Sequence, residues 1–272
     1  MHTKSFSSDA VQTIDELIEG ALKQNIHQVA ITEHWDMDYP HKDEIFEFDL
    51  NEYYEAFFRW KDLSLKKNGP NLLMGIEIGW QEHLKERINR TVSTLPFDVV
   101  LLSEHLFRGS DIFYSKECPK LSRKERNAEY LTNLVKMCKQ IDCFDILAHY
   151  DYINRYIEDP DSFVFYDDCP ELFDELFEVL IKKQKALEIN TMSINAQIKK
   201  GSPYTMPDPK IIKRYLDMGG ELITIGSDAH DSCNIGILFK ETAEYLKSLG
   251  VKRTYYFEKR KPLPDPEFQK DI

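Results

Sequence analysis

Histidine and carboxylate residues recur where short apolar segments of this sequence end. The apolar run that begins at Leu222 closes with Gly226, Ser227, Asp228, Ala229 and His230, so a carboxylate stands two residues from an imidazole. Both groups bind divalent cations and both can act as general acids or bases. Other apolar runs end in similar residues, which are His34, Glu77, His105, His149 and Asn190.

The apolar runs are typical of buried strands that alternate with helices. Strands are expected at 28–34, 71–79, 97–105, 144–150, 186–190 and 221–230. Helices are expected after the capping box that starts at Thr13, at 50–66, 122–140 and 170–184, from Asp208 to Gly219, and at 235–249. This alternation predicts an α/β fold with a parallel sheet covered on both faces, either a barrel or a doubly wound sheet. Because no linker interrupts the chain, we expect a single domain over residues 1–272.

In parallel α/β folds the carboxyl ends of the strands share one face, so these polar residues should converge there. A lone histidine at such a position is more often a hydrogen-bonded core or rim residue than a ligand. Six or seven together differ, because burying them without compensation would cost several kcal/mol each, whereas divalent cations satisfy them directly. Imidazole and carboxylate without thiolate favour Zn²⁺, Mn²⁺ or Fe²⁺ over Ca²⁺. Such polynuclear sites activate water and clamp phosphoryl oxygens, as phosphoester hydrolysis requires.

Composition restricts the partners and the compartment. The formal charge of −12 over 272 residues disfavours a long nucleic acid and leaves a small phosphorylated substrate, held through metal, as the expected ligand. No apolar run reaches the roughly 18 residues of a membrane span. The five cysteines form no C-x-x-C pair, and no secretory signal is evident, so we expect a cytoplasmic protein with reduced thiols. The sequence makes no prediction of oligomeric state.

An ordered set of motifs resembles the PHP (polymerase and histidinol phosphatase) family. The set is "ITEH" (31–34), "GIE" (75–77), "SEH" (103–105), "LAHYD" (147–151) and "GSDAH" (226–230). Within it, "GIEIGW", "DYINRY" and "EIN" are most similar to the histidinol-phosphate phosphatase branch. The resemblance implies a distorted TIM-like (β/α)7 barrel with three divalent metal ions. It also implies hydrolysis of L-histidinol phosphate in histidine biosynthesis.

Ligand sets follow from the resemblance, position by position. The first metal would be bound by the N-terminal histidine motif, Glu77 and Asp228, and the second by Glu77, His105 and His149. Glu77 would bridge these two ions, which lets them sit about 3.5–4 Å apart. The third metal would be bound by Asp9, His34 and His230. These assignments make Glu77, Asp228 and His230 the catalytic residues.

The resemblance also implies the residues that bind the substrate. Arg155 would contact the phosphate through its charged fork. Asn190 and Ser227 are assigned to the substrate as well. Asp228, His230 or another ligand would protonate the leaving alkoxide.

The N-terminus departs from the family pattern, which opens with a short strand carrying Asp-x-His-x-His. Here the chain starts Met1-His2-Thr3-Lys4, so the first strand is apparently truncated. In an ungapped alignment His2 is the first histidine and Lys4 replaces the second; with a one-residue insertion His2 is the second. Either way the first metal lacks at least one ligand. A late start or truncation, a two-metal variant and a decayed site that only binds are the competing explanations.

A second departure follows Asn190. Relatives usually carry a glycine and an arginine soon after this point, whereas here Lys199 and Lys200 are the nearest basic residues, and a solvated loop is the simpler interpretation of that pair. Two alternatives to a histidinol phosphatase therefore stay open. One is a PHP phosphoesterase for another small phosphate or nucleotide, and the other is a non-catalytic metal- or ligand-binding barrel.

Overall fold

The protein is built around a curled parallel sheet. The computed structural model describes residues 1–41 and 43–268. The sheet runs in the order β1-β3-β4-β7-β8-β9, with β2 pairing beside β3, and every pairing in it is parallel. Its strands are β1 (Gln28–Ile31), β2 (His34–Trp35), β3 (Asn71–Gly79), β4 (Val99–Ser103), β7 (Ile146–Leu147), β8 (Ala186–Asn190) and β9 (Ile223–Gly226).

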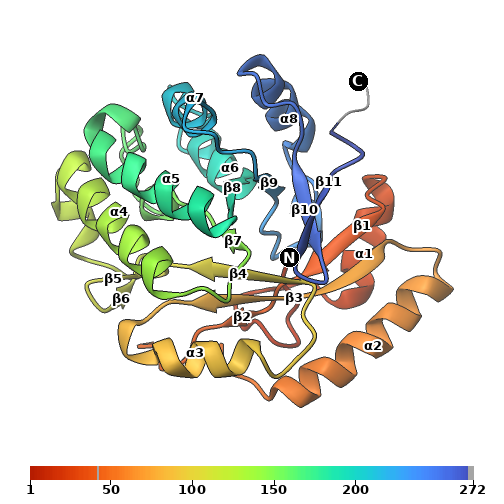
Figure 1. The fold of residues 1–272 in the computed structure, drawn as a ribbon. Coiled ribbons are helices and arrows are strands. Elements are labelled where there is room, and N and C mark those ends of the chain that lie inside the picture. The colour runs from red at the N-terminus through yellow and green to blue at the C-terminus, as the bar shows by residue number, and fades with distance from the viewer. Residues whose placement is uncertain (42, 269–272) are drawn as a thin grey trace.

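Helices follow the strands and line the outer side of the curled sheet (Figure 1). They are α1 (Ile14–Lys23), α2 (Leu50–Lys66), α3 (Lys85–Val92), α4 (Arg123–Gln140), α5 (Pro170–Lys183), α6 (Thr191–Lys199), α7 (Pro209–Asp217) and α8 (Phe239–Ser248). Local sequence fixes several starts: Thr13 and Glu16 form a reciprocal capping box, and the side chain of Asp208 accepts from the backbone N–H of Lys210. These starts agree with the sequence prediction.

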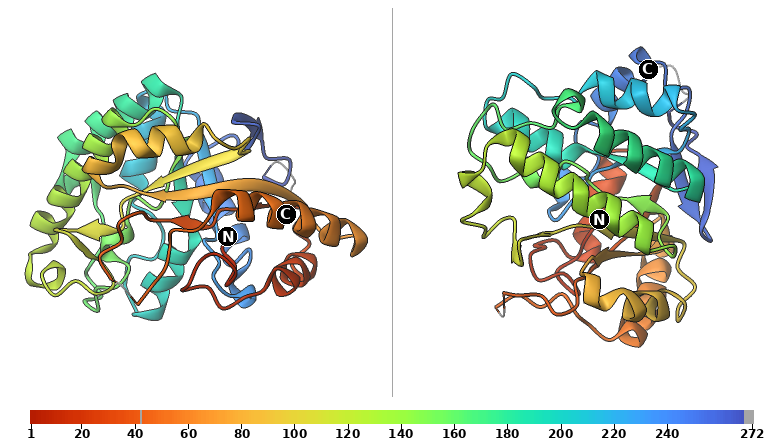
Figure 2. Two further views of the ribbon diagram at one scale, coloured as in Figure 1. Left: turned by 90° about the horizontal axis from the view of Figure 1, so that it is seen from below. Right: turned by 60° about the vertical axis from the view of Figure 1, so that its left-hand side comes forward.

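Two apolar layers hold the sheet. The larger lies between the sheet and the helices and includes fully buried Leu102, Leu147, Leu176 and Ile212. The smaller lies on the inner face and consists of Val99, Leu101, Ile146, Ala148, Ala186 and Phe257. Phe257 comes from an antiparallel hairpin, β10 (Tyr255–Glu258) with β11 (Lys261–Pro264). The views in Figures 1 and 2 show the resulting half-barrel.

The sheet does not close between its edge strands, β1 and β9. No strand precedes Gln28 among the described residues. Met1 and His2 lie between the edges instead, because Thr32 N–H donates to Met1 O at 2.9 Å and His2 N–H donates to Ala229 O at 3.1 Å. A cavity of about 590 Å³ adjoins them, with Ala30, Leu101 and Ile225 in its wall. Thus the short N-terminal segment reaches the carboxyl ends of the strands without a strand of its own.

The expected α/β architecture is confirmed, and three local elements were not foreseen. α3 has too few apolar residues to be read from its pattern, and α6 follows β8 without an intervening loop. A hairpin of β5 (Leu106–Phe107) and β6 (Ser110–Asp111) follows β4 and its histidine. Within the described ranges, none of the helices combines the length and the apolar character that crossing a membrane requires.

Candidate metal centre

The strand ends bring the predicted ligand residues together. Register pairs His34 of β2 with Glu77 of β3, and His105, His149 and Asp228 follow the ends of β4, β7 and β9. All five of these side chains are buried, as is His2 from the N-terminal segment. The convergence expected from the sequence is therefore what the fold produces.

The first grouping consists of His2, Glu77 and Asp228, each with a ligand atom within 4.8 Å of the others. His2 Nε2 lies 3.0 Å from Asp228 Oδ1 and 3.4 Å from Glu77 Oε2. The side chain of Lys4 is exposed, so it takes no place among these groups. Of the described residues near the start of the chain, His2 is the one that supplies an imidazole to this grouping.

The second grouping shares Glu77 and adds His105 and His149. The Nε2 atoms of the two histidines lie 3.1 Å and 2.9 Å from Glu77 Oε1. Ser103 at the end of β4 donates its hydroxyl to the same oxygen at 2.5 Å. Glu77 therefore presents one carboxylate oxygen to each grouping, which is the geometry a bridging ligand needs.

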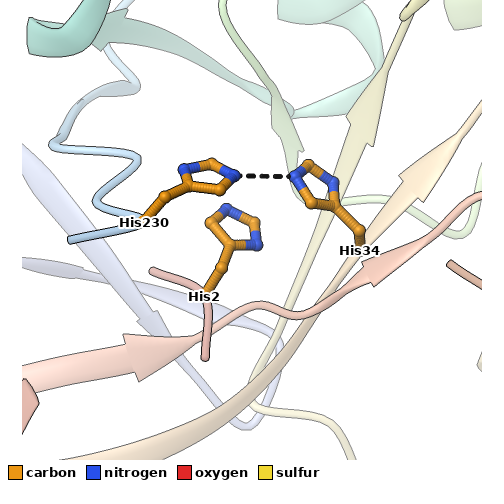
Figure 3. A group of neighbouring side chains, drawn as sticks. All are labelled: His2, His34 and His230. Atoms are coloured by element: carbon orange, nitrogen blue, oxygen red, sulfur yellow. Dashed lines mark hydrogen bonds between the residues drawn. The ribbon is translucent and has the colours of Figure 1, made fainter. Parts of the chain in front are cut away.

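The third grouping gathers around His34 and His230, whose Nε2 atoms are 3.1 Å apart (Figure 3). Asp9 Oδ2 lies 3.6 Å from His34 Nε2 and 3.1 Å from His230 Nε2. The His2 ring stacks on both imidazoles, with centroids 4.1 Å and 4.3 Å away. The three ligand-type groups expected for a third metal are adjacent.

Mutual charge controls ionisation in this cluster. Burial would raise the pKa of Glu77, but the charge of His34 and hydrogen bonds from His105 and His149 hold it well below its usual range. Burial likewise opposes ionisation of Asp228, whereas Arg155 and His2 lower its pKa. For His2, burial and the neighbouring imidazoles of His34 and His230 lower the pKa, so its ring is neutral, as a ligand must be.

Several buried atoms at the centre make no hydrogen bond within the described residues, although two of them, His34 Nδ1 and Asp36 Oδ2, lie 3.7 Å apart. His2 Nδ1, His34 Nδ1, His149 Nδ1 and Asp36 Oδ2 are buried and make no hydrogen bond. Ring nitrogens, carboxylate oxygens and the absence of thiolate match the donor preferences of Zn²⁺ and similar ions. The ring atoms that converge with the carboxylate oxygens of Glu77 and Asp228 are the Nε2 atoms of His2, His105 and His149, so the chemistry of this donor set fits divalent cations.

The sequence analysis missed Asp36, which stands two residues after His34. Asp36 Oδ1 lies 2.7 Å from His105 Nδ1, so it fixes the orientation and tautomer of that imidazole. Gly79 makes room for it, because a Cβ at that position would meet Asp36 Oδ1 at 1.8 Å. The spacing His-x-Asp at a strand end was the available signal.

Arg155 lies beside the metal-type groupings with its side chain buried. Its Nη1 donates to Asp228 Oδ2 at 2.7 Å and its Nη2 donates to Asn190 Oδ1 at 3.1 Å, while its Nε is buried without a partner. The Asn190 side chain also accepts hydrogen bonds from the first backbone N–H groups of α6, so it anchors the guanidinium to the start of that helix. Ser227 faces the cavity between β1 and β9, not the pocket at the strand ends. Arg155 is thus the one of these three that reaches the pocket directly.

The segment after Asn190 is helical, not a solvated loop. Lys199 closes α6, and Lys200 donates its ammonium to Asn154 O at 2.7 Å and to Ile157 O at 3.0 Å. Burial lowers the pKa of Lys200 to about 8. Because these two carbonyls flank Arg155, Lys200 supports the loop that presents the guanidinium and does not itself enter the pocket.

A pocket of about 370 Å³ opens over the groupings. Asp9, His34, His105, His149, Asp228 and His230 line its inner part together with Arg155. Aromatic residues of the loops after β2 and β4 form the outer walls, namely Tyr39, Phe46, Phe113 and Tyr114. The pocket thus has a floor of metal-ligand-type side chains with one arginine, and aromatic walls, a pattern that a small anionic substrate with an organic tail matches.

Comparison with known proteins agrees with this geometry. The sequence matches the PHP domain family over residues 1–192. It is 34% identical over 261 residues to a probable histidinol-phosphatase of Clostridium acetobutylicum, covering 96% of both chains. It is also 31% identical to a probable histidinol-phosphatase of Thermotoga maritima, covering 93% of this chain and 92% of the relative.

Solved structures share the fold. The histidinol phosphate phosphatase of Lactococcus lactis, complexed with zinc, L-histidinol and phosphate, aligns with a TM-score of 0.79 at 24% identity over 97% of each chain. A histidinol phosphatase from Listeria monocytogenes, described as putative by those who solved it, aligns with a TM-score of 0.70 at 16% identity, covering 88% of this chain and 97% of the other.

Proposed function

The chain belongs to the PHP family, and from this premise we propose that residues 1–272 form one metal-dependent phosphomonoesterase domain that hydrolyses L-histidinol phosphate to L-histidinol and phosphate. The observation that carries the proposal is a set of three clusters of ligand-type side chains beside a buried arginine. Two clusters share Glu77, and in the third Asp9 lies 3.6 Å from His34 and 3.1 Å from His230. The curated relatives, which align along nearly the whole chain, support the choice of substrate. The reaction belongs to histidine biosynthesis.

We assign three divalent ions, of zinc, manganese or iron, to the three groupings. His2, Glu77 and Asp228 would hold the first, Glu77, His105 and His149 the second, and Asp9, His34 and His230 the third. Bound there, the ions supply Lewis acidity, activation of water and neutralisation of charge on phosphoryl oxygens.

The protein groups position the substrate and its protons. Arg155 presents its guanidinium to the phosphate. Its hydrogen bonds to Asp228 and Asn190 fix the orientation of that guanidinium. A phosphoryl oxygen that accepts from Arg155 gains stabilisation as negative charge develops. We assign protonation of the departing alkoxide to Asp228, His230 or another ligand of the centre, and both named residues line the pocket.

The test is phosphate release from L-histidinol phosphate by the protein reconstituted with Mn²⁺ or Zn²⁺, next to a chelated sample. We expect turnover that depends on metal and exceeds the turnover of nucleoside monophosphates. Preference for a nucleotide would move the substrate assignment to another small phosphate. Metal binding without turnover of any ester would contradict the proposal and favour the non-catalytic alternative.

A further inference from the structure

The outer part of the strand-end pocket contains a carboxylate that belongs to none of the metal groupings. Asp111 lines the pocket with His105 and Arg155, yet none of the groupings of ligand atoms found in residues 1–41 and 43–268 includes it. Its side chain is buried, with 5% of the residue exposed. A buried carboxylate facing a substrate pocket outside the metal cluster requires its own explanation.

The hairpin after β4 holds Asp111 at a fixed place relative to the metal centre. β6 pairs Asp111 with Leu106 of β5, the residue that follows His105. The next residue, Ile112, donates its N–H to His105 O at 3.1 Å. Asp111 is therefore tied through backbone hydrogen bonds to a residue of the metal cluster, on the side where a substrate bound to that cluster would extend.

The hydrogen bonds that Asp111 accepts come from neutral donors. Its Oδ1 accepts the backbone N–H of Phe113 at 2.7 Å, and the hydroxyl of Tyr39 donates to the carboxylate. Neither donor is charged, and the ion pairs of the described residues do not involve Asp111. Both donors orient the carboxylate, and a cation bound in the pocket would form an ion pair with it.

Other acidic groups nearby are already engaged. Asp36 orients His105, and Glu44 accepts the hydroxyl of Tyr114 at 2.8 Å. The rings of Tyr39 and Tyr114 line the same pocket, and aromatic faces attract cations within about 6 Å. The outer wall thus combines aromatic rings with two carboxylates whose donors are neutral, those of Asp111 and Glu44, and Asp111 is the buried one of the two. This combination suits an organic ammonium.

We infer that Asp111 is a specificity residue that binds the primary ammonium group of the substrate while the phosphate lies at the metal centre. The inference rests on the proposed function and deepens it, because L-histidinol phosphate carries an ammonium on the carbon next to its ester methylene. Tyr39 and the Phe113 N–H hold the carboxylate toward this cation. The site therefore selects phosphate esters of amino alcohols over phosphate esters that lack an ammonium group.

The experiment compares matched ester pairs that differ only in the ammonium. The pairs are L-histidinol phosphate with its des-amino analogue, and O-phosphoethanolamine with ethyl phosphate. For each pair, the ratio compared is kcat/KM of the ester that carries the ammonium divided by kcat/KM of the ester that lacks it. We expect Asp111→Asn to reduce this ratio by about 10- to 100-fold, as for a lost hydrogen bond to a charged group. Tyr39→Phe should reduce the same ratio less. Asp43→Asn, at an exposed position of the neighbouring loop, is the control and should leave it unchanged.

The outcomes separate this inference from the proposed function. Turnover with an ammonium preference that survives in Asp111→Asn, or that is lost in Glu44→Gln instead, would overturn the role of Asp111. Loss of turnover on both members of a pair by the same factor would also overturn it, since that marks a structural or metal-linked role. If only the smaller aminated ester shows the Asp111-dependent preference, the inference stands and the substrate assignment falls. No turnover of any ester by the wild-type protein refutes the proposed function and this inference with it.

Discussion

Replacing Glu77 by Gln should abolish turnover of L-histidinol phosphate, with a loss of about a thousandfold or more, because the metal ions provide most of the charge stabilisation. Glu77 touches two groupings at once, through Oε1 to His105 and His149 and through Oε2 to His2. An amide keeps the shape but removes the negative charge and one acceptor oxygen. The bound metal should fall from three ions per chain to about one, since the third grouping does not include Glu77.

The matched control for this variant is Glu104→Gln. Glu104 is also buried and stands next to His105, but it belongs to none of the ligand groupings in the described part of the chain. Turnover and metal content of the control should stay within a few-fold of the wild type. Near-wild-type activity in Glu77→Gln, or an equal loss in the control, would refute a bridging role.

Arg155→Ala should lower kcat/KM by about 100- to 1000-fold, as expected when a preorganised charged donor to a phosphoryl group is removed. The guanidinium is buried and held by Asp228 and Asn190, and the Tyr152 ring lies under it with its centroid 4.8 Å from Cζ. Inhibition by inorganic phosphate should weaken in parallel, because this product would contact the same guanidinium of Arg155. Arg155→Lys should recover only part of the loss, since an ammonium cannot form two parallel hydrogen bonds.

Arg214→Ala is the control for Arg155, because Arg214 forms an ion pair with Asp174 away from the pocket, and its side chain is 42% exposed. The control should keep its phosphate inhibition. Unchanged phosphate inhibition in Arg155→Ala, with the fold intact by circular dichroism, would show that Arg155 serves Asp228 and not the substrate.

The sequence predicted the parts of this site that depend on strand direction. Apolar runs separated by helices imply parallel strands, and parallel strands place their last residues on one face. For that reason the proximity of Glu77, His105 and His149 could be predicted from the sequence. The resemblance added the identity of the partners, such as Asp9 with His34 and His230, which lie far apart in sequence and at different strand ends.

Features that depend on loop conformation escaped the sequence analysis. Asp36 follows β2 in an irregular segment, where the spacing His-x-Asp is its one local signal, and Asp111 ends the two-residue strand β6, where no local pattern distinguishes it from a surface carboxylate. Their roles follow from contacts with His105 and Tyr39 that exist only after the chain folds. The helix α6 was missed for a related reason, because its cap, Asn190, also ends the preceding strand and hides the boundary.

The structure shows how the N-terminal segment, which departs from the family pattern, is held at the centre. Sequence alignment left the first grouping at least one ligand short, and the fold supplies one N-terminal imidazole there, that of His2, against both Asp228 and Glu77. The Glu33 carboxylate accepts hydrogen bonds from Thr3 and Ser7, which ties the segment that carries His2 and Asp9 to the residue just before β2. A short segment without strand pairing of its own can thus be positioned by a buried carboxylate.

The most direct test of the metal-centre claim is an anomalous difference map from crystals of the protein grown with zinc, recorded at the zinc edge. The account predicts three peaks at the strand ends, one among His2, Glu77 and Asp228, one among Glu77, His105 and His149, and one among Asp9, His34 and His230. Peaks confined to surface sites, with the buried carboxylates and imidazoles bonded only to each other, would contradict it.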